Sequence, residues 1–323
     1  MPAKVKKAAQ GVEGAAKYAP RLVLDLPKTN LPVAVLLRDL PLTRRVKVVD
    51  IGANPMAADA AHKPLLDLGA CDVVGFEPQP VAFAELAKIK SERETYHQFA
   101  VGDGRQRMLR VYQDHGMTSF LPAYEAGQKA IAMRPWSGLL EEIAFDTKRL
   151  DDAGLGDFDL LKIDVQGAEN EVLAHATKAL AAATVVIVEL RFFRLYEGEP
   201  MLGGFDTQLR SMGFELHKFL FTKTRSLRNS QNARLRHRYF RDQILDGDAV
   251  YIKDISQIEG FTDAQLMHLA VLASAVFESH SLTLFCLDHL VARGAVPANL
   301  PARYVDSLPA SMRIEGDSPQ GQV

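Results

Sequence analysis

The stretch DIGAN, at residues 50–54, has the composition of a ligand-binding turn at the end of a buried strand. Asp50 and Asn54 offer polar groups, and Gly52 and Ala53 are small enough for a ligand to lie against the backbone. In doubly wound sheets, ligands bind beyond the carboxyl ends of the strands. The stretch therefore predicts a binding site, and its alternative is a tight turn that binds nothing.

A second acid stands where an adenosine cofactor would need it. Glu77 follows Asp50 by 27 positions (77 − 50) and closes the apolar run 72–77, which Pro78 stops. An acid at the end of the second strand is where the ribose hydroxyls of a nucleotide are bonded. The alternative is a surface glutamate before a helix that begins with proline. The two motifs together indicate an adenosine-type cofactor.

The loop after Asp50 narrows the choice of cofactor. A dinucleotide site needs the pattern G-x-G-x-x-G for close contact with the pyrophosphate, whereas this loop, GANPMAAD, has one glycine. A nicotinamide-dependent reductase is therefore disfavoured. S-adenosylmethionine has no phosphate, and nearby acids can neutralise its ammonium and sulfonium groups, so it fits the loop better.

Three further side chains could act on an acceptor. Asp164 and Glu189 close two later apolar runs, and His217 lies inside a third. A strand-end acid can take a proton from an acceptor, so Asp164 is the expected general base and Glu189 and His217 are its rivals. The alternatives are a capping role for Asp164 and simple packing for His217. Lys162 is expected to point to the opposite side of the sheet. Two acids do not make a coordination set, so no metal site is predicted.

Short apolar runs alternate with amphipathic ones from residue 46 onward, which is typical of a parallel sheet covered by helices on both faces. No clear helical period separates the last two runs, so these could pair antiparallel. The expected strands are residues 46–51, 72–77, 95–102, 107–113, 157–165, 183–190, 214–221 and 248–254. The expected helices are residues 60–69, 80–92, 168–180 and 205–213.

Six motifs, in this order, carry a resemblance to a known family: VVDIGAN, GFEPQP, AVGDG, MTSFLP, LLKIDVQGAENEVL and VVIVELRFFRLYEG. Over roughly residues 46–254 the chain resembles the FkbM family of S-adenosylmethionine-dependent methyltransferases. The resemblance implies a seven-stranded Rossmann-like class I methyltransferase fold, a mostly parallel sheet with an antiparallel last strand. It also implies O-methylation of sugar or polyketide hydroxyls. The chain departs from the family after Asn54, where many members continue with a glycine and aromatic residues.

The resemblance also assigns roles to individual positions. Gly102 and Asp103 would lie near the adenine, where Asp103 could accept a hydrogen bond from the amino group, unless GDG is an ordinary turn. Ser119 would touch the cofactor or serve as a turn residue. The predicted cofactor-binding set is Asp50, Gly52, Ala53 and Asn54 at the methionine end, Glu77 and Pro78 at the ribose, then Gly102, Asp103, Ser119 and Asp164.

The rest of the chain divides by pattern. Residues 1–45 are expected to form an N-terminal helical extension, 46–254 the methyltransferase domain, 255–310 a C-terminal helical extension and 311–323 a flexible tail. Within the third part, one or two helices with a broad apolar face begin after Thr262, a plausible cap. They would pack on the domain or form a dimer contact.

Composition excludes several classes of protein. The net charge of −2 argues against a general nucleic-acid binder. The two cysteines, Cys71 and Cys286, are far apart, which argues against a disulfide framework or a zinc ribbon. No run approaches the roughly 20 apolar residues of a membrane span. These features predict a cytoplasmic protein.

Residues 218–241 hold eight Lys or Arg and no Asp or Glu. This basic segment is either a solvated connection or a lid that attracts an anionic acceptor, such as a nucleotide-linked sugar, a lipid-linked glycan or a phosphorylated glycan. RNA is a weaker alternative, because the segment lacks regular aromatic interleaving. The predicted function is O-methylation of a glycan or similar hydroxylated metabolite. The alternative is a non-catalytic scaffold that binds a partner through its helical tail.

Overall fold

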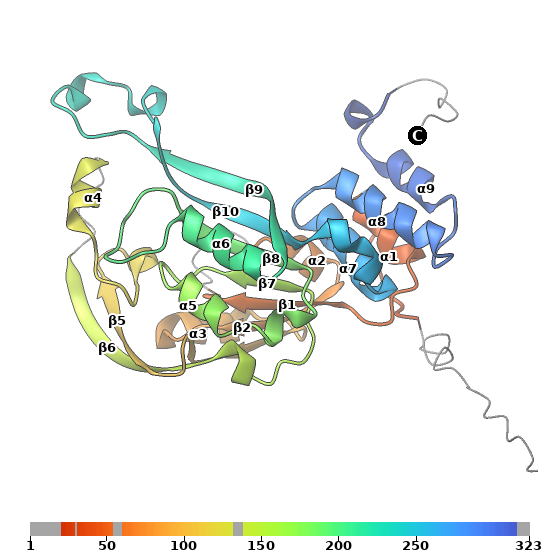
Figure 1. The fold of residues 1–323 in the computed structure, drawn as a ribbon, viewed down its shortest axis with the longest axis horizontal. Coiled ribbons are helices and arrows are strands. Elements are labelled where there is room, and N and C mark those ends of the chain that lie inside the picture. The colour runs from red at the N-terminus through yellow and green to blue at the C-terminus, as the bar shows by residue number, and fades with distance from the viewer. Residues whose placement is uncertain (1–20, 30, 54–59, 132–137, 315–323) are drawn as a thin grey trace, which may run out of the picture.

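The computed structural model describes residues 21–29, 31–53, 60–131 and 138–314. Within these residues, seven strands form a central sheet (Figure 1). Its first five strands run parallel, and β10 is antiparallel to both of its neighbours. The predicted fold class is therefore confirmed. In sheet order the strands are β3 (Glu94–His97), β2 (Cys71–Phe76), β1 (Val46–Ile51), β7 (Leu160–Ile163), β8 (Val185–Arg191), β10 (Gln243–Lys253) and β9 (Phe214–Arg225).

Apolar residues alternate between two buried cores, one on each face of the sheet. Val48, Ile187 and Val250 enter one core, whereas Val49 and Val188 enter the other. Both faces are thus buried, which is why β8 is buried along its whole length and begins with four consecutive apolar residues. The second core is covered by α5 (Glu169–Ala174) and α6 (Leu202–Ser211).

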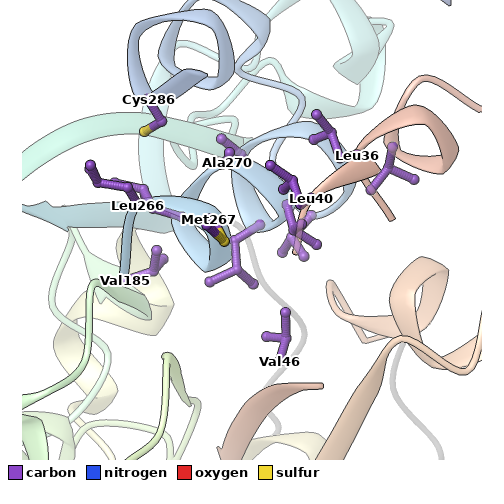
Figure 2. Close-up of a cluster of buried hydrophobic side chains, with 14 of the residues drawn as sticks. Leu36, Leu40, Val46, Val185, Leu266, Met267, Ala270 and Cys286 are labelled. Carbon is purple, nitrogen blue, oxygen red and sulfur yellow. The ribbon is translucent and has the colours of Figure 1, made fainter. Parts of the chain in front are cut away.

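The first core is covered by helices from both ends of the chain (Figures 1 and 2). Leu36 and Leu40 come from the N-terminal region, and Leu266, Met267 and Ala270 come from the C-terminal region. The helical segment after residue 255 therefore packs on the sheet, the first of its two expected positions. The helices are α1 (Val33–Asp39), α2 (Lys63–Asp67), α7 (Asp263–Ala275), α8 (His280–Ala292) and α9 (Leu300–Ser307).

The predicted cap of this segment is confirmed. The Thr262 hydroxyl accepts from the N–H of Gln265, and the Gln265 side chain accepts from the N–H of Thr262, which makes a capping box. No described helix is both long and apolar enough to cross a membrane.

A buried ion cluster ties the two chain ends to the sheet. Asp159 is 1% exposed and accepts two hydrogen bonds from Arg44, at 2.6 and 2.9 Å. It also accepts from the N–H of Lys47 at 2.8 Å and from Nδ1 of His268 in α7 at 2.9 Å. Burial alone would raise the pKa of Asp159, but His268 and Arg44 hold it well below its usual range.

A second, three-stranded sheet consists of β4 (Ala100–Val101), β6 (Leu139–Lys148) and β5 (Gln106–Tyr112). The strand β5 was predicted, but the expected strands did not include β6, and that omission was wrong. Leu139 and Leu140 are half exposed, so β6 has little of the apolar pattern that marks a buried strand. The strand predicted over 95–102 is divided between β3 and β4.

The last two strands continue into an arm that projects from the body (Figure 1). Beyond the pair Arg225–Gln243, residues 226–242 form the arm tip, with two short 3-10 helices, η5 (Asn232–Arg234) and η6 (His237–Tyr239). The arm tip contacts α4 (Glu125–Ala130) through the N–H of Arg228, which donates to the carbonyl of Ala130 at 2.7 Å.

Candidate active site

Polar side chains gather where the carboxyl ends of β1, β7 and β8 meet. Asp50 pairs in register with Lys162, and Lys162 with Ile187. Nζ of Lys162 lies 3.8 Å from Oδ1 of Asp50 and 3.6 Å from Oδ2 of Asp164. One buried ammonium therefore neutralises two strand-end carboxylates.

The expectation that Lys162 points away from this site was wrong. Side chains two positions apart share a face of a strand, so Lys162 and Asp164 lie on the same side. Burial alone would lower the pKa of Lys162, but Asp50 and Asp164 raise it above its usual range. The lysine is therefore charged.

The chain itself requires a glycine at position 52, which is a reason in addition to the predicted approach of a ligand. Its φ is +82°, and a Cβ there would overlap the backbone carbonyl of Asp164. The N–H groups of Gly52 and Ala53 both donate to the carbonyl of Phe76, at 3.0 and 3.2 Å. The glycine thus permits close approach of two loops of the chain itself. Asn54 lies outside the described residues.

Glu77 is 5% exposed at the end of β2. Its Oε1 accepts from the N–H of Gln79 at 2.8 Å, across Pro78. Burial raises the pKa of Glu77 to about 7, although the Gln79 N–H opposes the shift. No described residue donates to Oε2, so this oxygen can bond to a ligand.

His62 was not singled out in the sequence, and it lies buried near Asp50. Burial lowers the pKa of His62, and the charge of Asp50 opposes the shift, so the ring is neutral. Nδ1 of His62 and Oδ1 of Asp50 have no hydrogen-bond partner among the described residues. Buried polar atoms of this kind are normally satisfied, which points to a ligand or water at this position.

Gln166 connects the acids of β7 and β8. Its Nε2 donates to Oδ1 of Asp164 at 2.8 Å and to Oε2 of Glu189 at 2.6 Å. Its Oε1 accepts from Arg191 at 2.6 Å. The backbone of Gln166 has a φ of +56°, which is uncommon for a residue other than glycine. Ser119 holds this conformation, because its hydroxyl donates to the carbonyl of Gln166.

Arg191, also missed from the sequence, is the buried cation of this group. It pairs with Glu189 at 3.1 Å, Glu199 at 2.9 Å and Asp246 at 3.1 Å. Lys223, on β9, lies 3.2 Å from Asp246 and 3.6 Å from Glu189. The base of the arm is therefore joined directly to the acids of the site.

The pKa values of Asp164 and Glu189 move in opposite directions. Burial alone would raise the pKa of Asp164, but Lys162 and the hydrogen bond from Gln166 lower it below its usual range. Burial and the charge of Asp164 raise the pKa of Glu189 well above its usual range, although Arg191 opposes the shift. Asp164 is therefore the more readily ionised of the two acids.

Asp164, Glu169 and Glu189 each have a carboxylate oxygen within 4.8 Å of the others. Each of the three carboxylates already accepts hydrogen bonds from the chain. Glu169 accepts from the N–H groups of Val165 and Gly167, at 3.0 to 3.1 Å, and the other two accept from Gln166. The three acids hold the loop after β7 in place, and we assign no metal to them.

The carboxylate of Asp103 accepts hydrogen bonds from neighbouring residues of the chain. Its oxygens accept from the N–H of Arg105 at 2.9 Å, from Arg107 at 2.7 Å and from Thr147 at 3.3 Å. Gly102 packs closely on Thr147. This arrangement agrees better with the turn alternative than with a hydrogen bond to adenine.

His217 is not brought to the acids. Its Nε2 lies 2.7 Å from the hydroxyl of Ser279, and its ring makes an edge contact with Phe277. Both partners belong to the connection between α7 and α8, at the C-terminal helices. These contacts agree with the alternative in which His217 has a packing role and not a catalytic one.

Comparison with known families decides the classification. The family described as the methyltransferase FkbM domain matches residues 50–216, about half of the chain. The chain belongs to the FkbM methyltransferase family. The predicted family is thereby confirmed, and with it S-adenosylmethionine as the cofactor. The FkbM match includes Asp50, Glu77, Asp164 and Glu189, and it stops one residue before His217.

One relative and two solved structures add context to the FkbM assignment. The 2-O-methyltransferase NoeI of Sinorhizobium fredii (strain NBRC 101917 / NGR234) is 41% identical over 61 residues, 18% of this chain. The match spans only 25% of that relative's length.

Methyltransferase FkbM from Methylobacillus flagellatus KT is 15% identical, with a TM-score of 0.33, over 64% of this chain and 43% of that one. Magnesium protoporphyrin IX methyltransferase (ChlM) from Synechocystis PCC 6803, solved with bound SAM, is 13% identical, with a TM-score of 0.35, over 68% and 76%. Likeness at this level carries no argument about substrate.

Proposed function

We propose that this FkbM-family chain transfers a methyl group from S-adenosylmethionine to a hydroxyl of a sugar, glycan or similar hydroxylated metabolite. The observation that carries the proposal is the position of Asp164 at the carboxyl edge of the sheet, 3.6 Å from the ammonium of Lys162 and hydrogen-bonded to the Gln166 side chain that also bonds Glu189. A hydroxyl acceptor needs a base within hydrogen-bond reach, and Asp164 is suited to that role.

Side chains at this edge have polar atoms that can form hydrogen bonds with the cofactor. Oε2 of Glu77 is available to a ribose hydroxyl. Oδ1 of Asp50 and Nδ1 of His62 lack described partners and would face the amino-acid end. When bound, S-adenosylmethionine supplies an electrophilic methyl group on a sulfonium.

The chain's own residues would then position the acceptor and move its proton. Lys162 and Gln166 keep Asp164 ionised, so it can take the proton from the acceptor hydroxyl. Glu189 and Arg191 fix Gln166, and thereby fix the direction of the Asp164 carboxylate. Holding the reacting groups in line can lower the activation free energy by about 7–11 kcal/mol.

A cavity of about 400 Å³ offers a place for the acceptor. Phe193 and Arg194, which line it, come two and three residues after Arg191, the last residue of β8, and Tyr124 and Met201 line it as well. Aromatic rings suit the apolar face of a sugar, and Arg194 suits an anionic substituent. We propose that an acceptor, neutral or anionic, enters on this side.

The scaffold alternative has less support, since α7 and α8 bury their apolar residues in the chain's own core rather than offering them to a partner. A homodimer remains a prediction.

Two measurements test the proposal. Calorimetric titration with S-adenosylhomocysteine should show binding at one site. Incubation with methyl-labelled S-adenosylmethionine and a cell extract should then give a labelled product, which mass spectrometry would identify as a methyl ether. Absence of binding, or a label found only on nitrogen or carbon, would reject the proposal.

A further inference from the structure

The arm tip, residues 226–242, combines charge and apolar surface in a way that the site does not explain. It holds Arg228, Arg234, Arg236, Arg238 and Arg241 and one acid, Asp242, a net charge of +4 (5 − 1). The whole chain has a net charge of −2, so the remainder carries −6 (−2 − 4). The positive charge is therefore concentrated on the projecting part of an otherwise acidic molecule.

The five arginines have no acidic partner among the described residues. Arg234 donates to Oε1 of Gln231, and Arg238 donates to the hydroxyl of Tyr239 and lies 4.7 Å from the centre of its ring. Lys223, which lies on β9 nearer the site, differs from these arginines because it pairs with Asp246. The guanidinium groups of the arm tip are thus available to an anionic partner.

Large apolar side chains stand exposed among these arginines. Leu227 is 50% exposed, Tyr239 is 66% exposed and Phe240 is 42% exposed. Leu227 follows the last residue of β9 by two positions, and Phe240 precedes the first residue of β10 by three, so both flank the neck where the strands separate. Apolar side chains that gather on an exposed surface among polar residues are one mark of a contact with a protein or a membrane.

We propose that the arm tip docks on an anionic phospholipid surface. Arginine side chains attract anionic headgroups, and aromatic side chains prefer the boundary between headgroups and acyl chains. A membrane accommodates both on a small projecting surface. A single-stranded nucleic acid would instead need a groove with successive stacking platforms, and Tyr239 and Phe240 are the only exposed aromatic residues of the described arm tip.

Docking would also orient the body of the protein. The arm leads from its tip to Lys223, which contacts Glu189 and Asp246 in the site. A membrane-bound arm would place the acceptor side of the sheet near the lipid surface (Figure 1). The docking itself does not rest on the proposed methyltransferase activity.

Sedimentation with vesicles tests the proposal on the full chain. Vesicles of phosphatidylcholine with about one third phosphatidylglycerol should carry the protein down, and pure phosphatidylcholine vesicles should not. Replacing Arg234, Arg236 and Arg238 together by Ser should weaken binding about a hundredfold, since each arginine near an anionic leaflet contributes about fivefold. The triple variant Lys88→Ser, Lys90→Ser and Lys178→Ser removes the same charge from exposed positions on the body and should bind as the parent does.

A second measurement does not depend on the triple variants folding. In the variant Tyr239→Trp, fluorescence emission should shift to the blue on anionic vesicles relative to the parent, because the indole enters the interface. Equal sedimentation of the arm and body variants, no sedimentation of the parent, or no shift would overturn the proposal. Binding of a labelled single-stranded oligonucleotide without vesicle binding would overturn it as well.

Discussion

Asp164 and Glu189, at the carboxyl ends of the neighbouring parallel strands β7 and β8, share one hydrogen-bond donor, the side-chain Nε2 of Gln166. Their surroundings nevertheless differ. The Asp164 side chain is 30% exposed and lies beside Lys162, whereas that of Glu189 is 6% exposed and lies beside a second carboxylate. Two acids whose pKa values are driven apart in this way are suited to different tasks.

The variant Asp164→Asn tests the assignment of the general base. It keeps the shape of the side chain and removes its basicity, so turnover should fall by about 10²–10⁴-fold. Affinity for S-adenosylhomocysteine, measured by calorimetry, should be close to that of the parent. The control is His217→Ala, which should retain turnover because His217 packs against Ser279 and Phe277. Full activity in Asp164→Asn would move the role to another residue.

Cofactor binding should depend on pH through Glu77. Burial raises the pKa of its carboxyl to about 7, and the ionised form is the better acceptor for ribose hydroxyls. Affinity for S-adenosylhomocysteine should therefore rise as the pH increases from 6 to about 8 and then level off. In Glu77→Gln the affinity should be lower and independent of pH over this range. A parent profile as flat as that of the variant would contradict the role of Glu77.

Gly52 should tolerate no side chain. Its φ is +82°, and a Cβ would overlap the carbonyl of Asp164, so Gly52→Ala should lower the free energy of unfolding by about 3 kcal/mol or more. The matched variant is Gly203→Ala, in α6, where no atom lies within 4 Å of the added Cβ. That change should stabilise the protein by up to about 1 kcal/mol. Urea unfolding measures both, and similar effects from the two variants would refute the steric argument.

Asp159→Asn should destabilise the protein by about 3 kcal/mol, because it leaves Arg44 and His268 without their buried partner. The folded-state pKa of Asp159 is lowered, so its contribution is present above the unfolded value of about 3.9 and is lost as the pH falls through the folded value. The difference in unfolding free energy should therefore shrink towards low pH. The exposed neighbour Asp157 provides the control, since Asp157→Asn should change stability by less than about 0.5 kcal/mol.

The sheet could be predicted because its strands are buried on both faces. Runs such as 183–190 therefore differ clearly in composition from the helices between them. The strand β6 could not be predicted, since most of its side chains face solvent and its pairing with β5 depends on a distant segment. The covering role of α7 was left open for a similar reason: an apolar helix does not specify which surface it packs on.

The acids at the strand ends were predictable, but their connections were not. Strand-end position alone drew attention to Asp50, Glu77, Asp164 and Glu189. Gln166 and Arg191 join Asp164 and Glu189 through contacts that depend on a loop with positive φ and on the register of β8 against β10. The strand alternation that applies to Asp164 applies equally to Lys162, and it would have placed this lysine correctly.

The position of α7 sets a limit on how the chain can be shortened. A fragment cut to the family-matched residues 50–216 would lose most of β1 and all of β10 and α7, so Val185 and Ile187 would lose the residues that cover them and an apolar surface would be exposed. Such a fragment would be expected to precipitate on expression, so the smallest useful unit for engineering reaches through α9.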